Sequence, residues 1–197
     1  TAIRETLASS FSKDLTKNIK LQTLLDVFSE IKMNASCSQE SINRFILDVE
    51  GISDNIVSQY WNGEDVMAIF FNEFNRYKAK SESGQVFTPD HITSFIYRIT
   101  DTTSDDYVLD AACGSGAFLV KSMCNMIKDV GGANTIRGKQ IAETQLYGIE
   151  YDREIYALAC ANMLIHKDGK TNLELMDSRT SEAGLWIKSK PISKVLM

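Results

Sequence analysis

Apolar residues recur at helical spacing through the first eighty positions of the chain. Four stretches carry this pattern, and together they predict a wholly helical N-terminal domain over residues 1–80. Their positions are, in chain order, Leu21, Leu24, Leu25, Phe28 and Ile31; Ile42, Phe45, Ile46 and Val49; the short segment Asp54–Trp61; and Val66, Ile69, Phe70, Phe74 and Tyr77. A bundle of this kind is more typical of a scaffold or docking surface than of a chemical site.

The pattern changes after the small, polar stretch Lys78–Gly84, and short apolar runs then alternate with helical stripes. We expect strands from Val108, over Gln145–Glu150, over Asn172–Met176 and within Ser193–Met197, and helices after Pro89, over Ala117–Val130 and over Arg153–His166. The glycine-rich stretch Gly131–Lys139 is expected to be a surface loop. This alternation predicts an α/β domain over residues 81–197, a Rossmann-like parallel sheet whose ligand binds at the carboxyl ends of its strands.

Composition and charge narrow the class of protein. The hydrophobic fraction of 44% is sufficient for a packed core, and no stretch approaches the roughly 20 apolar residues of a membrane span. The net charge is −5, from 21 basic and 26 acidic residues. Proteins that bind DNA by themselves usually carry a basic face. If this chain acts on DNA, we therefore expect another domain or subunit to supply much of the phosphate contact.

The cysteines and histidines exclude two further classes of site. Cys37, Cys113, Cys124 and Cys160 are widely spaced, and the chain has only two histidines. This pattern indicates neither a disulfide framework nor a zinc site, so we expect no metal and a reducing cytoplasm.

The stretch Val108–Leu119 carries the clearest chemistry. Gly114 and Gly116 flank one small residue and allow the backbone to approach a ligand with no Cβ in the way. The helix that follows offers free N–H groups and the positive end of its dipole to an anion. A dinucleotide fingerprint would need glycine at Leu119 and an acidic residue about 20 positions on. The stretch therefore predicts a nucleotide cradle of another kind.

Acidic residues follow the predicted strands at the edge where a ligand would bind. Asp110, Glu150 and Asp177 each lie at a carboxyl strand end, which is the arrangement that one pocket requires. Three carboxylates suit a cationic ligand with an ammonium group, ribose hydroxyls and an adenine amine, and they suit a pyrophosphate poorly. This chemistry favours S-adenosylmethionine.

Two motifs resemble those of S-adenosylmethionine-dependent DNA adenine methyltransferases. The string Asp110-x-x-Cys113-Gly114-Ser115-Gly116-x-Phe118-Leu119 resembles motif I of that family. About twenty residues earlier, Gly84-Gln85-x-Phe87-Thr88-Pro89 resembles motif X, which closes over the methionine end of the cofactor. By itself the second string also fits a helix entry, with Thr88 as the N-cap and Pro89 at the first helical position.

The resemblance assigns expected roles to single residues. Glu150 matches the acidic residue of motif II, which holds the ribose, and Tyr151 would lie along the adenine edge. Asp152 is expected to cap the following helix. Asp177 matches motif III, which accepts from the adenine amine, although Asp-Ser is also good turn chemistry. The full set of expected cofactor-binding residues is Phe87, Thr88, Pro89, Asp110, Cys113, Gly114, Ser115, Gly116, Phe118, Glu150, Tyr151 and Asp177.

The helical front end extends the resemblance to one group within the family. With Phe70-Phe71-Asn72-Glu73-Phe74 shortly before the motif X string, it is similar to the modification subunit of type I restriction-modification systems. Such a subunit acts on DNA with a specificity subunit and, in the complete system, a restriction subunit. The target adenine would be flipped out of the duplex.

The family's catalytic signature, Asn-Pro-Pro followed by Tyr or Phe, does not occur in this sequence, whose only prolines are Pro89 and Pro191. In the family it follows directly on the fourth strand, so we expect it just after Met197. We assign no catalytic residue, interpret the chain as the cofactor-binding half of a longer protein, and expect no methyl transfer from the chain as given. The alternatives are a protein-glutamine or RNA-adenine methyltransferase, and a non-catalytic docking module with a vestigial nucleotide fold.

Overall fold

The computed structural model describes residues 38–56, 63, 65–69, 87–166 and 172–197. Contacts divide the chain into two compact units, Thr1–Tyr60 and Trp61–Met197. The expected domain boundary at residue 80 and the helical stretches before residue 38 and after residue 69 lie outside the described residues. Within the described part of the chain, no helix combines the length and apolar character that a membrane crossing requires.

The described part of the first unit is one helix, α3, which spans Gln39–Ile56. It confirms a helix at the second predicted stripe. However, α3 runs on through Asp54, where we expected a separate third helix to begin. Gly51 does not break it, because a single glycine in a helix costs only about 1 kcal/mol relative to alanine.

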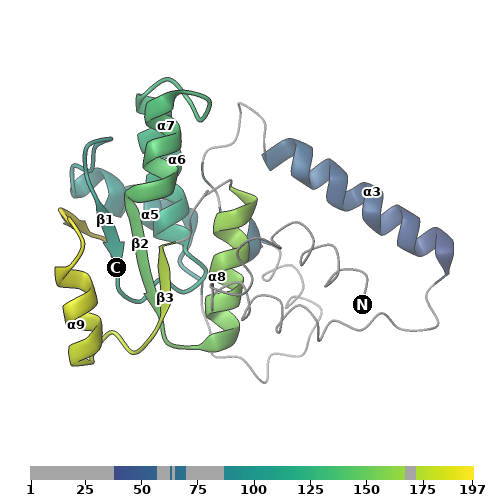
Figure 1. Cartoon of the computed structure of the whole chain (residues 1–197). Helices are drawn as coiled ribbons and strands as arrows, with labels where there is room; N and C mark the ends of the chain where they lie inside the picture. Colours follow the sequence, from purple (N-terminus) through teal and green to yellow (C-terminus); the bar gives the residue numbers. More distant parts are fainter. Residues whose placement is uncertain (1–37, 57–62, 64, 70–86, 167–171) are drawn as a thin grey trace. The chain divides into compact units, whose positions relative to one another are not determined.

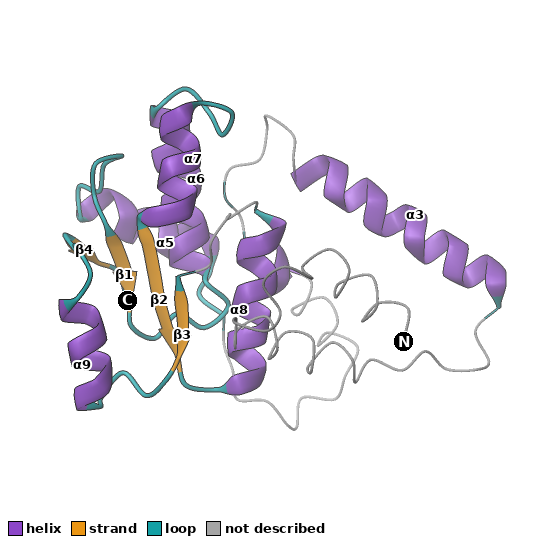
Figure 2. Ribbon diagram, viewed as in Figure 1, coloured by secondary structure: helices purple, strands orange, loops and turns teal. Residues whose placement is uncertain are grey.

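The second unit confirms the predicted α/β fold (Figures 1 and 2). Four parallel strands lie in the order β3-β2-β1-β4. Their bounds are Val108–Asp110 for β1, Leu146–Glu150 for β2, Leu173–Leu175 for β3 and Lys194–Val195 for β4. The helices are α5 (Asp90–Ile99), α6 (Ala117–Asp129), α7 (Ile136–Thr144), α8 (Arg153–Ile165) and α9 (Ser181–Lys188).

Part of the expected loop Gly131–Lys139 is helical, which corrects the sequence prediction. Helix α7 begins at Ile136, and the hydroxyl of Thr135 caps it by accepting from Gly138 N at 2.9 Å. The glycines that indicated a loop adopt positive φ at Gly131 and Gly132, just before the cap. The chain therefore turns at these glycines and then enters a helix.

The pleat of β2 places helices on both faces of the sheet. A Cβ added at Gly148 would clash with Leu173 and would lie 2.9 Å from Leu119 Cδ1 of α6. The preceding residue, Tyr147, points to the other face, where its ring meets Trp186 of α9 edge-on with the centroids 6.1 Å apart. Since successive side chains of a strand alternate between faces, α6 and α9 cover opposite sides of the sheet.

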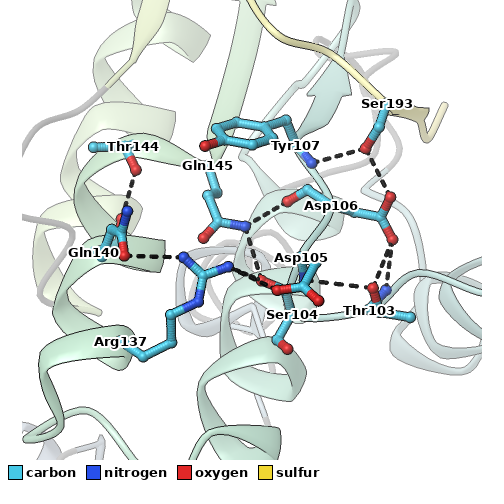
Figure 3. A network of polar contacts seen from close by, with 10 residues as sticks. All are labelled: Thr103, Ser104, Asp105, Asp106, Tyr107, Arg137, Gln140, Thr144, Gln145 and Ser193. Atoms are coloured by element: carbon cyan, nitrogen blue, oxygen red, sulfur yellow. Dashed lines mark hydrogen bonds and ion pairs between the residues drawn. The ribbon is translucent and has the colours of Figure 1, made fainter.

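A polar network fixes the amino ends of the strands (Figure 3). The buried amide of Gln145 donates to the carbonyls of Ser104 and Asp106, at 2.9 and 2.6 Å. The carboxylate of Asp106 accepts from the backbone and hydroxyl of Thr103, at 2.8 and 3.0 Å, and from Ser193 Oγ at 2.7 Å. These bonds join the segments that enter β1, β2 and β4, and they lie at the end of the sheet opposite to the glycine turn.

Candidate functional site

The glycine turn connects β1 to α6 in a conformation that needs its two glycines. Gly114 has φ +55° and Gly116 has φ +87°, both in the left-handed region that other residues rarely adopt. Cys113 N donates to Ile149 O at 2.9 Å, so the chain still pairs with β2 as it leaves β1. Gly116 N then donates to Cys113 O at 2.7 Å and closes the turn.

The glycine turn borders open space and presents backbone N–H groups to it. A Cβ added at Gly114 would meet no atom within 4 Å, so the backbone there borders open space. Gly116 is the N-cap of α6 and offers no side chain to the first helical N–H groups. These groups have no intrahelical partner and carry the positive end of the helix dipole. The turn can therefore accept an anionic group directly on the backbone.

Glu150 ends β2 beside the turn, as the sequence predicted. Its Oε2 accepts from Gly114 N at 3.0 Å, and its Oε1 accepts from Tyr151 N and Asp152 N, both at 2.8 Å. A carboxylate offers about four acceptor positions, and three are engaged here. The carboxylate is thus held by backbone groups and keeps capacity for a ligand hydroxyl.

Asp110 ends β1 and is almost completely buried, with 1% of its surface exposed. Its Oδ1 accepts from Ala112 N at 3.1 Å. Burial raises the pKa of this carboxyl to about 7, and the negative charge of Glu150 adds to the rise. Burial likewise raises the pKa of the Cys113 thiol, which faces Gly148 inside the sheet. Asp110 therefore changes charge near neutral pH, next to the turn.

The motif X residues lie at the start of α5, and the structure corrects their predicted capping. Pro89, not Thr88, is the N-cap, because its carbonyl accepts from Ile92 N at 2.9 Å and Thr93 N at 3.2 Å. Proline suits this position, since its missing N–H is not needed there. Thr88 and Phe87 are half-buried just before the cap.

An ion pair fixes the motif X segment to α6. Lys121 Nζ lies 2.7 Å from Asp90 Oδ1, and the lysine side chain is only 5% exposed. Lys121 lies one turn inside α6, so the pair holds the start of α5 beside the helix that leaves the glycine turn. The motif X segment, which leads into α5, is thereby held beside α6, the helix that follows the glycine turn.

Asp177 lies beyond the end of β3, at the same edge of the sheet as Glu150. Met176 N donates to Glu150 O at 3.0 Å, which fixes this segment next to β2. The Asp177 carboxylate is engaged by Arg179, at 2.9 Å from Nε and 2.7 Å from Nη2. These hydrogen bonds lower the pKa of Asp177 to about 2. In this structure Asp177 is therefore ionised and paired with arginine, and its expected contact with adenine stays a prediction.

The last two expected positions differ in exposure. Tyr151, next to Glu150, is 73% exposed. Phe118, in the first turn of α6, is buried. Asp152 caps α8 as predicted, because its Oδ1 accepts from Glu154 N at 2.9 Å and Ile155 N at 3.0 Å.

A buried polar cluster under the turn was missed from the sequence. The Ser115 hydroxyl donates to Asp65, and the amide of Asn162 donates to Asp65 Oδ1 at 2.8 Å and to Ser115 O at 2.9 Å. All three residues are buried: Asp65 is 8% exposed, Ser115 3% and Asn162 0%. A signal did exist, since Asn162 is the one amide in the otherwise apolar run Ala157–Ile165. The contribution of Ser115 to a ligand would come from its backbone, since its side chain points inward.

The chain is similar in sequence to known DNA methylases. The model of the family described as N-6 DNA methylase matches residues 64–196. The "Type II restriction enzyme and methyltransferase RM.BcgI" of Heyndrickxia coagulans is 31% identical over 188 residues, which is 90% of this chain and 29% of the relative. The "Type I restriction enzyme MjaVII methylase subunit" of Methanocaldococcus jannaschii is 33% identical over 87 residues, 44% of this chain and 13% of the relative. The chain thus spans less than a third of the length of these relatives.

Solved structures share the fold. A structure of the type I R-M system, described by its complex assembly and conformational transition, matches with a TM-score of 0.58 and 20% identity, over 89% of this chain and 34% of that one. The "ATP-dependent Type ISP restriction-modification enzyme LlaBIII bound to DNA" matches with a TM-score of 0.51 and 17% identity, over 90% of this chain and 16% of that one. At these identities the likeness concerns the fold.

Proposed function

Since the chain belongs to the N-6 DNA methylase family, we propose that it forms the S-adenosylmethionine-binding half of an enzyme that methylates the N6 amine of adenine in DNA. The observation that carries this proposal is the bond between Glu150 Oε2 and Gly114 N, at 3.0 Å. It joins an acidic strand end to an open glycine turn, and a ligand on the turn would therefore lie beside the carboxylate.

The residues present fit S-adenosylmethionine by their chemistry. The backbone of the turn and the start of α6 suit the ligand's carboxylate, and the buried acid Asp110 suits its ammonium group. Glu150 has acceptor capacity for ribose hydroxyls. When bound, the cofactor supplies an electrophilic methyl group on a sulfonium. A pyrophosphate would instead face the carboxylates of Asp110 and Glu150, and this repulsion disfavours a dinucleotide.

The adenine of the cofactor would lie toward Tyr151 and Asp177. Tyr151 is exposed and can cover a ring, and Asp177 follows β3 at the same sheet edge. Arg179 holds both oxygens of Asp177 in this structure. We infer that an adenine amine must share this carboxylate with the arginine or displace it.

DNA and a DNA-reading partner complete the proposal. The chain carries a net charge of −5, which is unfavourable for holding a duplex by itself. Several relatives are named as methylase subunits of type I restriction enzymes, which favours a separate specificity subunit and, for restriction, a further one. The relative from Heyndrickxia coagulans is named for restriction and methylation together, which would favour one longer chain. Co-purification with the products of neighbouring genes separates these arrangements.

Calorimetric titration tests the cofactor. We expect S-adenosylmethionine to bind, and NAD and ATP not to bind. Replacing Glu150 with alanine should weaken binding by more than about tenfold, or about 1.4 kcal/mol, as for a lost hydrogen bond to a charged group. The matched control is Glu143→Ala, which removes an exposed carboxylate at the end of α7. Equal binding of NAD, or an equal loss in the control, would contradict the assignment.

A second experiment tests the methyl acceptor. The enzyme of which this chain is proposed to be the cofactor-binding half is incubated together with its partner, with labelled S-adenosylmethionine and with DNA, RNA or protein as acceptor; the chain as given should transfer no methyl group in the same assay. Label on adenine N6 of DNA is the expected result. Label on RNA or on protein glutamine would favour the corresponding alternative enzyme, and a chain that binds no cofactor would favour the docking module.

A further inference from the structure

The carboxylate of Asp65 is held under the glycine turn, fifty positions away in the sequence. It accepts from Ala68 N at 2.8 Å, from Asn162 Nδ2 at 2.8 Å and from the hydroxyl of Ser115. Asp65 is only 8% exposed, and burial raises the pKa of its carboxyl. Its bonds with Ser115 and Asn162 therefore join the turn and α8, and its bonds with the backbone N–H groups of Met67 and Ala68 cap its own local helix.

These bonds fix the middle of the turn from two sides. The Ser115 side chain is tied to Asp65, and the Ser115 carbonyl accepts from Asn162 Nδ2 at 2.9 Å. Asn162 itself donates to Asp65, so the three groups form a closed triangle. Ser115 lies between Gly114 and Gly116, the two residues with positive φ. Because glycines restrict the backbone least, the turn needs an outside constraint to stay in one conformation.

We propose that Asp65 is a positioning residue for cofactor binding: through Ser115 and Asn162 it holds the glycine turn in the conformation that receives S-adenosylmethionine. This inference rests on the proposed function and names a residue ahead of both sequence motifs. Asp65 does not touch the ligand in this role. It lowers the conformational cost of binding, because a preordered loop loses less freedom when the ligand arrives.

A simple helix cap would not show this arrangement. A capping aspartate needs only an N–H of its own first turn, and Asp65 has that bond with Ala68. Burial of a carboxylate is costly unless it is fully hydrogen-bonded. Here the remaining acceptor positions are directed at Ser115 and Asn162 of two other elements. The site of action is therefore the turn, and capping alone does not account for it.

Three variants test the proposal. Asp65→Ala removes every bond of this carboxylate, and we expect S-adenosylmethionine to bind at least about tenfold more weakly. Ser115→Ala should also weaken binding, and the double variant should be no weaker than Asp65→Ala, since Asp65→Ala already removes the bond between the two side chains. Asp65→Asn should bind within about threefold of the unmodified protein, because the Ser115 hydroxyl can reverse and accept from the new amide.

The control variant is Asp106→Asn. Amide hydrogen exchange provides a measurement that does not need the ligand. Asp106 also accepts three hydrogen bonds from side-chain and backbone donors, but at the opposite end of the sheet (Figure 3). In the ligand-free protein, Asp65→Ala and Ser115→Ala should speed amide exchange at residues 113–118, and Asp106→Asn should not.

The outcomes separate the inference from the function on which it rests. If the unmodified protein binds no S-adenosylmethionine, the proposed function fails, and the exchange data still decide whether Asp65 orders the turn. Unchanged exchange and binding in folded Asp65→Ala would overturn the inference. So would additive losses in the double variant, or an equal loss in Asp106→Asn. If Asp65→Ala does not fold, Ser115→Ala and Asp65→Asn carry the same test.

Discussion

The pKa of Asp110 predicts how cofactor affinity depends on pH. Burial raises this pKa to about 7 in the free protein, from an ordinary value of 3.8 for an aspartate. A cationic ligand favours the ionised carboxylate. Binding should therefore release a proton below pH 7, and affinity should rise with pH until Asp110 is ionised in the free protein. The stability of the unliganded protein depends on pH in the opposite direction. Because the pKa of Asp110 is raised in the folded state, stability falls as the pH rises from about 4 through about 7.

The size of the effect follows from the ionised fraction. With a pKa of about 7, that fraction is about 3% at pH 5.5 and about 76% at pH 7.5. If only the ionised form binds, the apparent Kd should be about 25-fold weaker at the lower pH. Because Glu150 contributes to the raised pKa, Glu150→Gln should move the midpoint to lower pH and keep the slope.

Calorimetric titration at several pH values, in buffers of different ionisation enthalpy, measures both the affinity and the protons released. Asp110→Asn keeps the acceptor for Ala112 N but cannot ionise, so its affinity should vary less than about threefold over the same range. A slope that survives in this variant would assign the titration to another group. An unmodified protein with pH-independent affinity would show that Asp110 does not face the ligand's charge.

Four further substitutions test packing, capping and the adenine side of the site. Gly148→Ala should destabilise the fold by about 1–3 kcal/mol, because its Cβ enters occupied space between α6 and β3; Gly184→Ala, whose Cβ meets no atom within 4 Å, should be neutral or stabilising by up to about 1 kcal/mol in urea titrations. Asp152→Ala should cost about 1 kcal/mol in the same assay, since it removes the cap of α8. Arg179→Ala should free the carboxylate of Asp177 and strengthen S-adenosylmethionine binding in calorimetry; weaker binding would mean that the arginine itself contacts the ligand.

The sequence indicated the sheet and the turn because both follow from local rules. The apolar run that ends at Asp110 predicts a strand, and the glycine pair after it predicts a sharp turn. Glu150 ends the next apolar run. Parallel pairing then brings these ends to one edge, as the bond from Gly114 N to Glu150 confirms. Helix α7 was missed because the glycines before it indicated a loop, and the prediction did not use Thr135 as a helix N-cap.

The cluster under the turn was missed for a different reason. Asp65 lies just before an apolar helical stripe, so the sequence indicates a cap and gives no measure of burial. Its partners Ser115 and Asn162 are fifty and ninety-seven positions away, and no periodicity links such positions. Only the folded chain shows that the three residues meet.

The two buried carboxylates have a common physical consequence. Asp65 accepts from Ser115 of the glycine turn and Asp110 precedes the turn at the end of β1, and burial raises the pKa of both carboxyls. A core built for stability alone would place apolar side chains there, because each buried acid disfavours its own ionised form. Asp106, at the other end of the sheet, is by contrast half-buried, and its hydrogen bonds with Ser193 and Thr103 lower the pKa of its carboxyl. A cationic ligand at the carboxyl ends of the strands would therefore favour the ionised form of Asp110, whereas Asp106 at the amino ends already has its ionised form favoured by hydrogen bonds within the protein.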